Sequence, residues 1–277
     1  MAADRGRGRL VAGAGLVGLF AAATLLAPWL APVDPTHVPA SLAQAMLRPP
    51  GAGHLLGTDA LGRDLLSRVL HGGRVSLAIG IGVEAVSAAI GIALGLLAGY
   101  YGGWRDGVLM RLTDVVMAFP SLILAIGLIA VFERPGLDKV AVVLVALGWT
   151  TIARVVRGEV LSVKEREYVQ AARALGTPDP LLMLRHVLPN LAGPVIVTAT
   201  IGVGSNMVAE AGLSFLGLGA QAPTLSWGSM LAEGQTFLAS APWVAVFPGL
   251  ALMLAVLGIN LLGDALRDRL DPRLRRG

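Results

Sequence analysis

The sequence predicts an all-α polytopic membrane protein with six transmembrane helices. Of its 277 residues, 55% are hydrophobic and only 14% are charged, and the mean hydropathy is +0.72. An ordinary soluble domain has about 45–50% apolar and about 25% charged residues, and a disordered chain is poorer still in apolar residues. The chain also contains several charge-free runs of about 20 residues, the length that a helix needs to cross a bilayer.

Six runs are the predicted spans. In chain order they cover residues 10–33, 85–104, 115–132, 140–153, 187–209 and 234–263. The second run reaches back to Val75 if Glu84 is tolerated within a span, and residues 244–262 are the more continuously apolar part of the sixth. The fourth run has only 14 residues, but the long side chains of Arg154 and Arg157, which follow it, could extend to the water interface.

The first span has an alternative explanation. Three arginines precede it, as in a secretory signal peptide. Its 24 charge-free residues exceed the roughly 7–15 apolar residues of such a signal. We therefore favour a retained membrane anchor.

The basic residues predict the orientation of the spans. With a cytoplasmic N-terminus, six spans place 16 of the 22 basic residues on the inner side and 6 on the outer side, as the positive-inside rule requires. A further charge-free run, 211–232, is too rich in Gly, Ser, Gln, Thr and Pro for a lipid-facing helix. As a seventh span it would also place five tail arginines outside, namely Arg267, Arg269, Arg273, Arg275 and Arg276. We therefore expect both termini in the cytoplasm.

This topology divides the chain into four parts. Residues 1–33 are the N-terminal tail and first span, 34–74 are an extracytoplasmic segment, 75–265 are a five-helix core, and 266–277 are a cytoplasmic tail. The core contains a cytoplasmic loop at 160–190 and an extracytoplasmic loop at 213–243.

A short helix is predicted near the end of the extracytoplasmic segment, from Leu61 toward Leu70. Thr58 or Asp59 could cap its N-terminus, and Leu65, Leu66 and Val69 would lie on one face. The helix would lie on the outer membrane surface, or it would offer a docking surface for a soluble partner or a neighbouring subunit.

Two signals concern the packing of the spans. Gly91, Gly95 and Gly99 form two overlapping GxxxG units in the second span, which allow another helix to approach closely. Phe119-Pro120 in the third span should interrupt the hydrogen-bond ladder and bend the helix.

Three carboxylates in or near the spans are candidates for the transport pathway, because a charge at bilayer depth is costly and usually functional. They are Glu84, Asp114 and Glu210. Asp114 alternatively forms a helix-surface ion pair with Arg111, three residues earlier. A proton- or sodium-coupled carrier normally has a fuller polar relay, so an ion-coupled secondary transporter is the weaker alternative.

The sequence lacks the residues that several chemistries need. It has no cysteine, which excludes a disulfide scaffold, a Cys-ligated metal centre and a thiol nucleophile, and its four histidines offer little for a metal site. It also has no GxSxG nucleophile elbow and no HExxH metal pair. We therefore expect neither an enzyme nor a bound metal, and no nucleic-acid partner.

The loop 160–190 predicts a helical hairpin in the cytoplasm. Ser162 with Glu165 fits a capping box, and residues 163–175 are good helix formers. Gly176 then stands where a left-handed residue ends a helix.

The second helix of this hairpin would span residues 178–187. Thr177 can cap it, two prolines suit its first turn, and Pro189 would end it. The hairpin would expose a face of mostly small residues, namely Ala171, Ala172, Ala174 and Leu175. Such a face suits insertion into a groove on another protein, and a helix pair resting on the membrane surface is the alternative.

The same loop resembles the EAA loop of ATP-binding-cassette (ABC) importer permeases, EAA-x3-G-x9-I-x-LP. The matching positions are Gln170, Ala171, Ala172, Gly176, His186, Leu188 and Pro189. Gln170 replaces the usual Glu, and His186 replaces the usual Ile, while Glu165 and Glu167 are close enough to supply the missing charge. Seven segments, two of them within this loop and five outside it, resemble the dipeptide/oligopeptide/nickel branch of the family, and within it the second of two permease subunits. Among the five are HLLGTDALGRDLLSR and LSFLGLGAQAPTLSWGSML.

This resemblance implies the type I ABC importer permease fold in a bacterial cytoplasmic (inner) membrane. It implies that a homologous second permease completes the pathway, that two ATPase subunits bind ATP and Mg, and that an extracytoplasmic solute-binding protein delivers a peptide, a nickel complex or a related small solute. The chain has no GxxxxGK[ST] phosphate loop and would hold no cofactor itself. Residues 165–176 would be the element that couples to the ATPases, and segments 34–74 and 213–243 would contact the binding protein.

Overall fold

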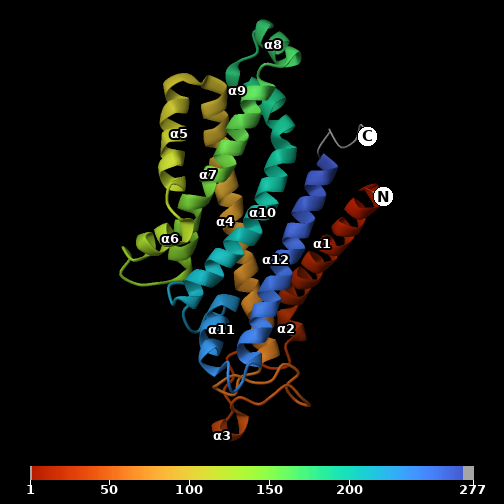
Figure 1. The fold of residues 1–277 in the computed structure, drawn as a ribbon, viewed down its shortest axis with the longest axis vertical. Coiled ribbons are helices and arrows are strands. Elements are labelled where there is room, and N and C mark those ends of the chain that lie inside the picture. The colour runs from red at the N-terminus through yellow and green to blue at the C-terminus, as the bar shows by residue number, and fades with distance from the viewer. Residues whose placement is uncertain (1, 271–277) are drawn as a thin grey trace.

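The chain is described by a computed structural model over residues 2–270, in which the side chains of residues 2–7 and 42–43 are not described. The predicted tail residues Arg273, Arg275 and Arg276 lie outside the described residues. Over residues 2–270 the regular elements are all helical, apart from two isolated β-bridges. The helices form an elongated bundle, with α8 (Glu167–Ala174) at one end and the short α3 (Leu42–Ala45) at the other (Figure 1).

Five helical segments are long and apolar enough to cross a membrane. They are α1 (Ala2–Leu25), α4 (Leu65–Tyr101), α7 (Leu137–Val163), the continuous run from α9 (Asp179–Leu182) into α10 (Leu188–Phe215), and α12 (Trp243–Leu270). A sixth span results if the bent pair α5 (Gly103–Met117) and α6 (Ser121–Ile129) counts as one. The prediction of an all-α protein with six spans is confirmed in this sense.

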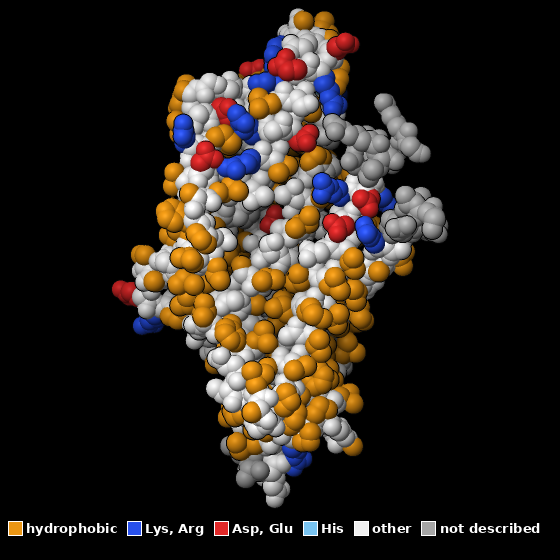
Figure 2. Space-filling view, viewed as in Figure 1, with side chains coloured by type: hydrophobic (Ala, Val, Ile, Leu, Met, Phe, Trp, Pro, Cys, Tyr) orange, Lys and Arg blue, Asp and Glu red, His pale blue; other side chains and the backbone are white. Residues whose placement is uncertain are grey.

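The distribution of side chains agrees with the predicted orientation. Apolar side chains cover the middle of the bundle, and charged side chains gather toward the end that carries α8 (Figure 2). The first residues of α1 and the last residues of α12 also lie toward that end (Figure 1). The two ends of the described chain are therefore on the same side of the apolar band.

The predicted bend at Phe119-Pro120 is confirmed. Pro120 is the N-cap residue of α6, and the axes of α5 and α6 differ by 89°, because proline has no N–H with which to continue the ladder. The third span differs from its predicted limits of 115–132, since α5 already begins at Gly103. Gly102, with a φ of +65°, turns the chain directly from α4 into α5.

Helices α4 and α7 pack along the predicted glycine strip. A Cβ added at Gly95 would lie 2.6 Å from the backbone oxygen of Ala153, and one added at Gly99 would lie 2.8 Å from Cβ of Val160. Real Cβ atoms do not approach other atoms so closely, so glycine is what lets these two helices meet. The prediction that Gly91, Gly95 and Gly99 form a close-packing strip is confirmed.

The predicted surface helix at residues 61–70 is wrong, because these residues are divided between a loop and α4. The first turn of α4 is capped by Asp64, whose Oδ2 accepts a hydrogen bond of 2.8 Å from the backbone N–H of Ser67. Of the expected caps, Thr58 donates to the backbone oxygen of Ala45 at the end of α3, and Asp59 accepts from the backbone N–H groups of Leu61 and Arg63. The segment before α4 also contains the one-turn helix α2 (Ala27–Leu30).

The run 211–232 does not form a span, as predicted. After α10 the chain makes a loop, and α11 (Trp227–Gly234) is only 8 residues long. Ser226 and Ser229 form a capping box at its start, and the buried Trp227 donates from Nε1 to the backbone oxygen of Val69 in α4, at 2.9 Å. A short 3₁₀ turn, Gln235–Phe237 (η2), then leads toward α12. Helix α11 therefore packs against α4, α10 and α12, toward the end of the bundle opposite α8 (Figure 1).

Candidate functional site

Residues 164–190 contain the predicted coupling element and are named the coupling segment after that prediction. They form the end of the bundle at which charged side chains gather (Figures 1 and 2). It consists of α8, α9 and a five-residue π-helical turn, Met183–Val187 (η1), which leads into α10. Its helical parts are joined by tight connections, so it is a compact hairpin rather than an open loop.

The start of the coupling segment differs from the prediction. The Ser162–Glu165 capping box is wrong, because Val163 is buried in the core between α4 and α7 and keeps α7 helical to that point. Helix α8 begins after Arg166, without a side-chain cap. Nζ of Lys164 donates a hydrogen bond of 2.8 Å to the backbone oxygen of Gly99, which satisfies one of the terminal carbonyl groups of α4.

The predicted end of the first helix is confirmed. Gly176 has a φ of +83°. Its N–H donates to the backbone oxygen of Arg173 at 3.0 Å, and the N–H of Thr177 donates to that of Ala172 at 3.2 Å. These two bonds are the pair that defines a Schellman motif. The turn between α8 and α9 is therefore built on the left-handed conformation of one glycine.

Two predictions about the second helix are wrong. Thr177 does not cap it, since the N-cap residue of α9 is Pro178. Pro189 does not end it, since the helix continues through η1 into α10. The N–H of Leu188 bonds to the oxygen of Met183, five residues earlier. This π-helical step changes the hydrogen-bond register directly before a residue that has no N–H to donate.

The side chains of the coupling segment form a buried set and an exposed set. Val169, Leu182 and Val187 are buried in the core shared with α4 and α7. By contrast, the apolar side chains of Leu175 and Leu184 are 87% and 62% exposed. The hairpin is thus anchored to the spans by one face, and on the other it exposes two leucines among charged side chains such as Glu165 and Glu167.

The residues predicted for coupling lie on this exposed face or at its edge. Glu165, Glu167, Gln170, Ala171, Gly176 and Pro189 are exposed, and Ala172, His186 and Leu188 are half-buried. Of the predicted small-residue face, Ala171, Ala174 and Leu175 are exposed as expected, whereas Ala172 packs against the core. The amide of Gln170 donates to the backbone oxygen of Lys164 at 3.0 Å and to Oε2 of Glu165 at 3.3 Å, so it braces the turn between α7 and α8.

A contact that the sequence did not predict joins the coupling segment to α4. The hydroxyl group of Tyr100, near the end of α4, donates a hydrogen bond of 2.7 Å to Oδ1 of Asp179 at the start of α9. Arg173 of α8 lies over the ring of Tyr100, with its Cζ 5.3 Å from the ring centroid. The interaction with that tyrosine raises the pKa of the Arg173 guanidinium above its usual value, so the group that faces the ring is a cation. The sequence feature that could have indicated this contact is the pair Tyr100 and Tyr101 at the end of a long apolar run, because tyrosine places a polar group at the edge of an apolar segment.

The three candidate pathway carboxylates bind different partners. Asp114 does not pair with Arg111, because its Oδ1 accepts a hydrogen bond of 2.6 Å from Arg154 of α7 instead. Glu84 of α4 is 6% exposed and accepts a hydrogen bond of 2.8 Å from Nδ2 of Asn206 in α10.

Glu210 is fully buried in α10. Its carboxylate accepts hydrogen bonds from the hydroxyl groups of Ser76 in α4, at 3.1 Å, and Ser214, at 2.7 Å. Oγ of Ser76 also accepts from the backbone N–H of Trp227 at 3.2 Å. Glu210 therefore connects α4, α10 and the start of α11 through hydroxyl groups.

A cavity of about 860 Å³ lies beside the break between α5 and α6, with α7, α10 and α12 completing its wall. The wall is largely apolar and includes the amides of Asn206 and Asn260. Asn206 also binds Glu84, so this carboxylate stands directly behind the wall, whereas Asp114 and Glu210 do not line the cavity. Among the described residues, no group of three or more His, Asp or Glu side chains could hold a metal ion.

A known protein family matches the C-terminal two thirds of the chain. Residues 91–276 match the family described as "Binding-protein-dependent transport system inner membrane component". The chain is 43% identical over 229 residues to the dipeptide transport system permease protein DppC of Alkalihalophilus pseudofirmus, covering 83% of this chain and 75% of that protein. It is 46% identical over 226 residues to the glutathione transport system permease protein GsiD of Pectobacterium atrosepticum, covering 82% and 75%.

Two further similarities agree with these. The chain is 44% identical over 257 residues to the di/tripeptide transport system permease protein DppC of Pseudomonas aeruginosa, covering 91% of this chain and 84% of that protein. Among solved structures, a chain of the MetNI methionine ABC transporter, described in inward-facing conformations, matches with a TM-score of 0.60 at 18% identity, covering 74% of this chain and 96% of that chain. At that identity the match concerns the fold.

Proposed function

The chain belongs to the family of binding-protein-dependent transport system inner membrane components, and from that premise we propose that it moves short peptides across the membrane as one of two permease subunits. It is a permease subunit of an ABC importer in the inner membrane, and not an enzyme. The observation that supports the proposal is the coupling segment, which combines a buried anchor with exposed leucines at the end of the bundle where charged side chains gather (Figure 2).

The relatives support peptides as the solute. Their names specify dipeptides, di- and tripeptides, and glutathione, which are all short peptides that carry a free carboxylate. A nickel complex, which the sequence resemblance also allowed, has no counterpart among these names. Short peptides are therefore the solute class that we propose.

The partners follow from the missing energy source. The family is the membrane component of a larger importer, and this chain has no phosphate loop. We assign ATP and Mg to two partner ATPases, pathway formation to a homologous second permease, and delivery to an extracytoplasmic solute-binding protein. ATP-driven closure of the ATPases would move the coupling segment and thereby favour an outward-facing pathway. A shift of this equilibrium from 1:99 to 99:1 needs about 5.5 kcal/mol of differential binding.

The roles of individual residues follow from their positions. Leu175 and the exposed Ala171 would enter a cleft on the ATPase, and Gln170 would hold the α7–α8 turn while they do so. Glu84, behind the wall of the large cavity, would be the carboxylate nearest to the pathway. Glu210 would hold α11 in place, and Asp114 would pair α5 with α7.

Cross-linking tests the coupling role directly. The chain has no cysteine, so Ala171→Cys introduces a single reactive thiol, and a bifunctional reagent should join it to an ATPase in membranes that contain the whole importer. Val142→Cys in α7, at a side chain that is 60% exposed, is the control and should give no ATPase adduct. ATP-dependent uptake of alanyl-alanine tests the solute class. Adducts only with lipid would contradict the coupling role, and uptake that proceeds without the ATPases would support an ion-coupled carrier instead.

A further inference from the structure

A second cavity, of about 540 Å³, lies at the opposite end of the bundle from the coupling segment. We call it the outer pocket. It lies between the first turns of α4, helix α11 and the loop 217–225, and its charged lining residues are Arg63, Arg68 and Glu233. A solute that arrives from the extracytoplasmic side meets this end of the chain first.

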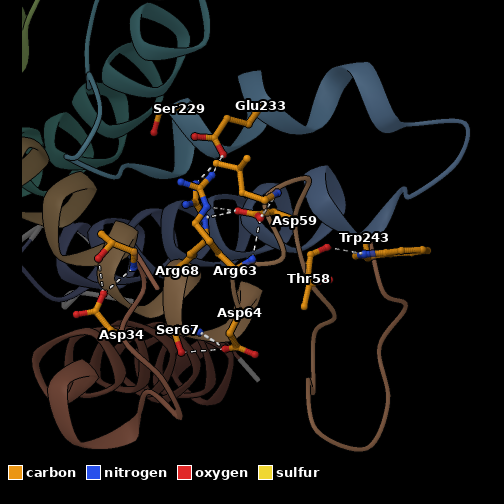
Figure 3. Close-up of polar contacts among 12 residues, drawn as sticks. Asp34, Thr58, Asp59, Arg63, Asp64, Ser67, Arg68, Ser229, Glu233 and Trp243 are labelled. Carbon is orange, nitrogen blue, oxygen red and sulfur yellow. Dashed lines mark hydrogen bonds and ion pairs between the residues drawn. The ribbon is translucent and has the colours of Figure 1, made fainter. Parts of the chain in front are cut away.

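The charged residues form a closed network (Figure 3). Arg68, which is 1% exposed, donates from Nη2 to Oε2 of Glu233 at 2.6 Å, and its Nε lies 3.2 Å from Oδ2 of Asp59. Arg63 uses the same two carboxylates, with its Nε 2.7 Å from Oδ2 of Asp59 and its Nη2 3.1 Å from Oε2 of Glu233. Two guanidinium groups therefore share two carboxylates.

The guanidinium of Arg68 is not saturated by this network. Within the part of the chain that the structure describes, its Nη1 is buried and has no hydrogen-bond partner, and its Nε does not reach hydrogen-bond geometry with Asp59. A buried N–H group without an acceptor is costly. A guanidinium presents its N–H groups as a planar fork that matches the two oxygens of a carboxylate. Nη1 shares one edge of this fork with Nη2, which binds Glu233. A carboxylate that takes the place of Glu233 at Nη2 could therefore also satisfy Nη1.

The two carboxylates of the network differ in their freedom to move. The side chain of Asp59 is 3% exposed, whereas that of Glu233 is 43% exposed. An incoming carboxylate can therefore replace Glu233 at the arginines, and Glu233 then becomes available for an ammonium group. A ligand with both groups adds no net charge beside the buried guanidinium of Arg68, which avoids the cost of an unpaired buried charge.

We propose that the outer pocket binds a small zwitterion, with its carboxylate on Arg63 and Arg68 and its ammonium group on Glu233. The volume is in the range of about 300–1,000 Å³ that is usual for small-molecule sites. The inference rests on the proposed function in one respect, which is that a short peptide is the zwitterion that arrives at this end. If the pocket binds such a peptide, the outer pocket is the entry site of this permease.

Protection of a single cysteine tests the proposal without requiring transport. Thr224 lines the outer pocket and is exposed, so Thr224→Cys places the only thiol of this chain at its mouth. Labelling by the neutral reagent N-ethylmaleimide is measured in membranes that contain the whole importer, with alanyl-alanine, its C-terminal amide or N-acetyl-alanyl-alanine as the probe. Leu55→Cys is the control, because Leu55 is 71% exposed and does not line the pocket.

We expect alanyl-alanine to slow labelling at position 224 saturably and to leave position 55 unchanged. The amide, which lacks the carboxylate, should not protect. Arg63→Gln removes the more exposed arginine and should raise the half-protecting concentration of alanyl-alanine about tenfold, the change expected for one lost charged hydrogen bond. Glu233→Gln should weaken protection by alanyl-alanine. It should not weaken protection by the acetylated peptide, which has no ammonium group.

Equal labelling with and without alanyl-alanine, in a variant that inserts and assembles normally, overturns the proposal, as does equal protection by the amide. Uptake of alanyl-alanine by the unlabelled importer is measured in parallel. Uptake without protection would leave the proposed function intact and remove the site, whereas protection without uptake would keep the site and remove peptide import.

Discussion

Gly176 fixes the turn between α8 and α9, so Gly176→Val is the most direct perturbation of the coupling segment. A Cβ added there meets no atom within 4 Å, and the cost therefore comes from the backbone alone. At a φ of +83° an L-residue pays about 1–2 kcal/mol relative to its preferred conformations, and a β-branched residue pays more. If the turn opens instead, the two hydrogen bonds of the Schellman motif are lost, at about 0.5–1.5 kcal/mol each.

A penalty of about 2 kcal/mol changes the ratio of native to altered hairpins about 30-fold. We expect the Gly176→Val importer to insert normally but to hydrolyse more ATP per peptide transported, because an altered hairpin transmits closure of the ATPases less faithfully. The assay is peptide uptake and ATP hydrolysis measured together in proteoliposomes that contain all subunits.

Two control variants separate backbone strain from the mere presence of a side chain. Gly176→Asn should behave nearly as wild type, because asparagine tolerates the left-handed conformation. Gly158→Val makes the same substitution at an exposed position of α7 where a Cβ also meets no atom within 4 Å, and it should retain transport. Wild-type uptake per ATP by Gly176→Val, at wild-type expression, would refute the reasoning.

Three further outcomes are expected from the contacts described above. Tyr100→Phe removes the hydrogen bond to Asp179, worth about 0.5–1.5 kcal/mol, and should raise the ATP consumed per peptide transported. Asp179→Asn keeps an acceptor and should raise it less. The same ATP consumption per peptide in the wild type and both variants would contradict a role of this hydrogen bond in coupling. Gly95→Ala should reduce the free energy of unfolding by about 1–3 kcal/mol, because its Cβ would lie 2.6 Å from a backbone oxygen of α7. The loss would appear as a lower thermal midpoint in detergent. Gly82→Ala, whose Cβ would lie in open space, should leave the midpoint unchanged. Glu210→Ala should cost about 1–3 kcal/mol by leaving two buried hydroxyl groups without an acceptor, and Glu210→Gln should restore most of it, as read from the same melting curves.

Features with a local cause were predictable from the sequence. Pro120 lacks an N–H, and it separates α5 from α6 as expected. Gly176 can adopt a left-handed conformation, and it ends α8 as expected. The glycines of α4 lie at a spacing of four, which places them on one face of any helix. Each of these inferences needs only the chemistry of one residue or the periodicity of one helix.

Features that depend on a choice between partners were not predictable. Asp114 had Arg111 within reach along its own helix, yet it pairs with Arg154 of another helix. Thr58 and Asp59 were acceptable caps for a local helix, yet other backbone contacts occupy both, and Asp64 caps α4 instead. In each case several local pairings have similar energies, so packing decides among them.

The sequence by itself determined that this is a membrane protein of the importer family. The lengths of the apolar runs, the uneven distribution of basic residues and the EAA-like motif can all be recognised without a structure. The tertiary structure alone decided which residues meet. It placed Tyr100 against the coupling segment and brought Arg68 to Glu233, 165 residues away in the chain. The physical reason is that hydrophobic burial is non-directional and fixes only which segments enter the membrane, whereas hydrogen bonds and ion pairs need positions that exist only once the helices have packed.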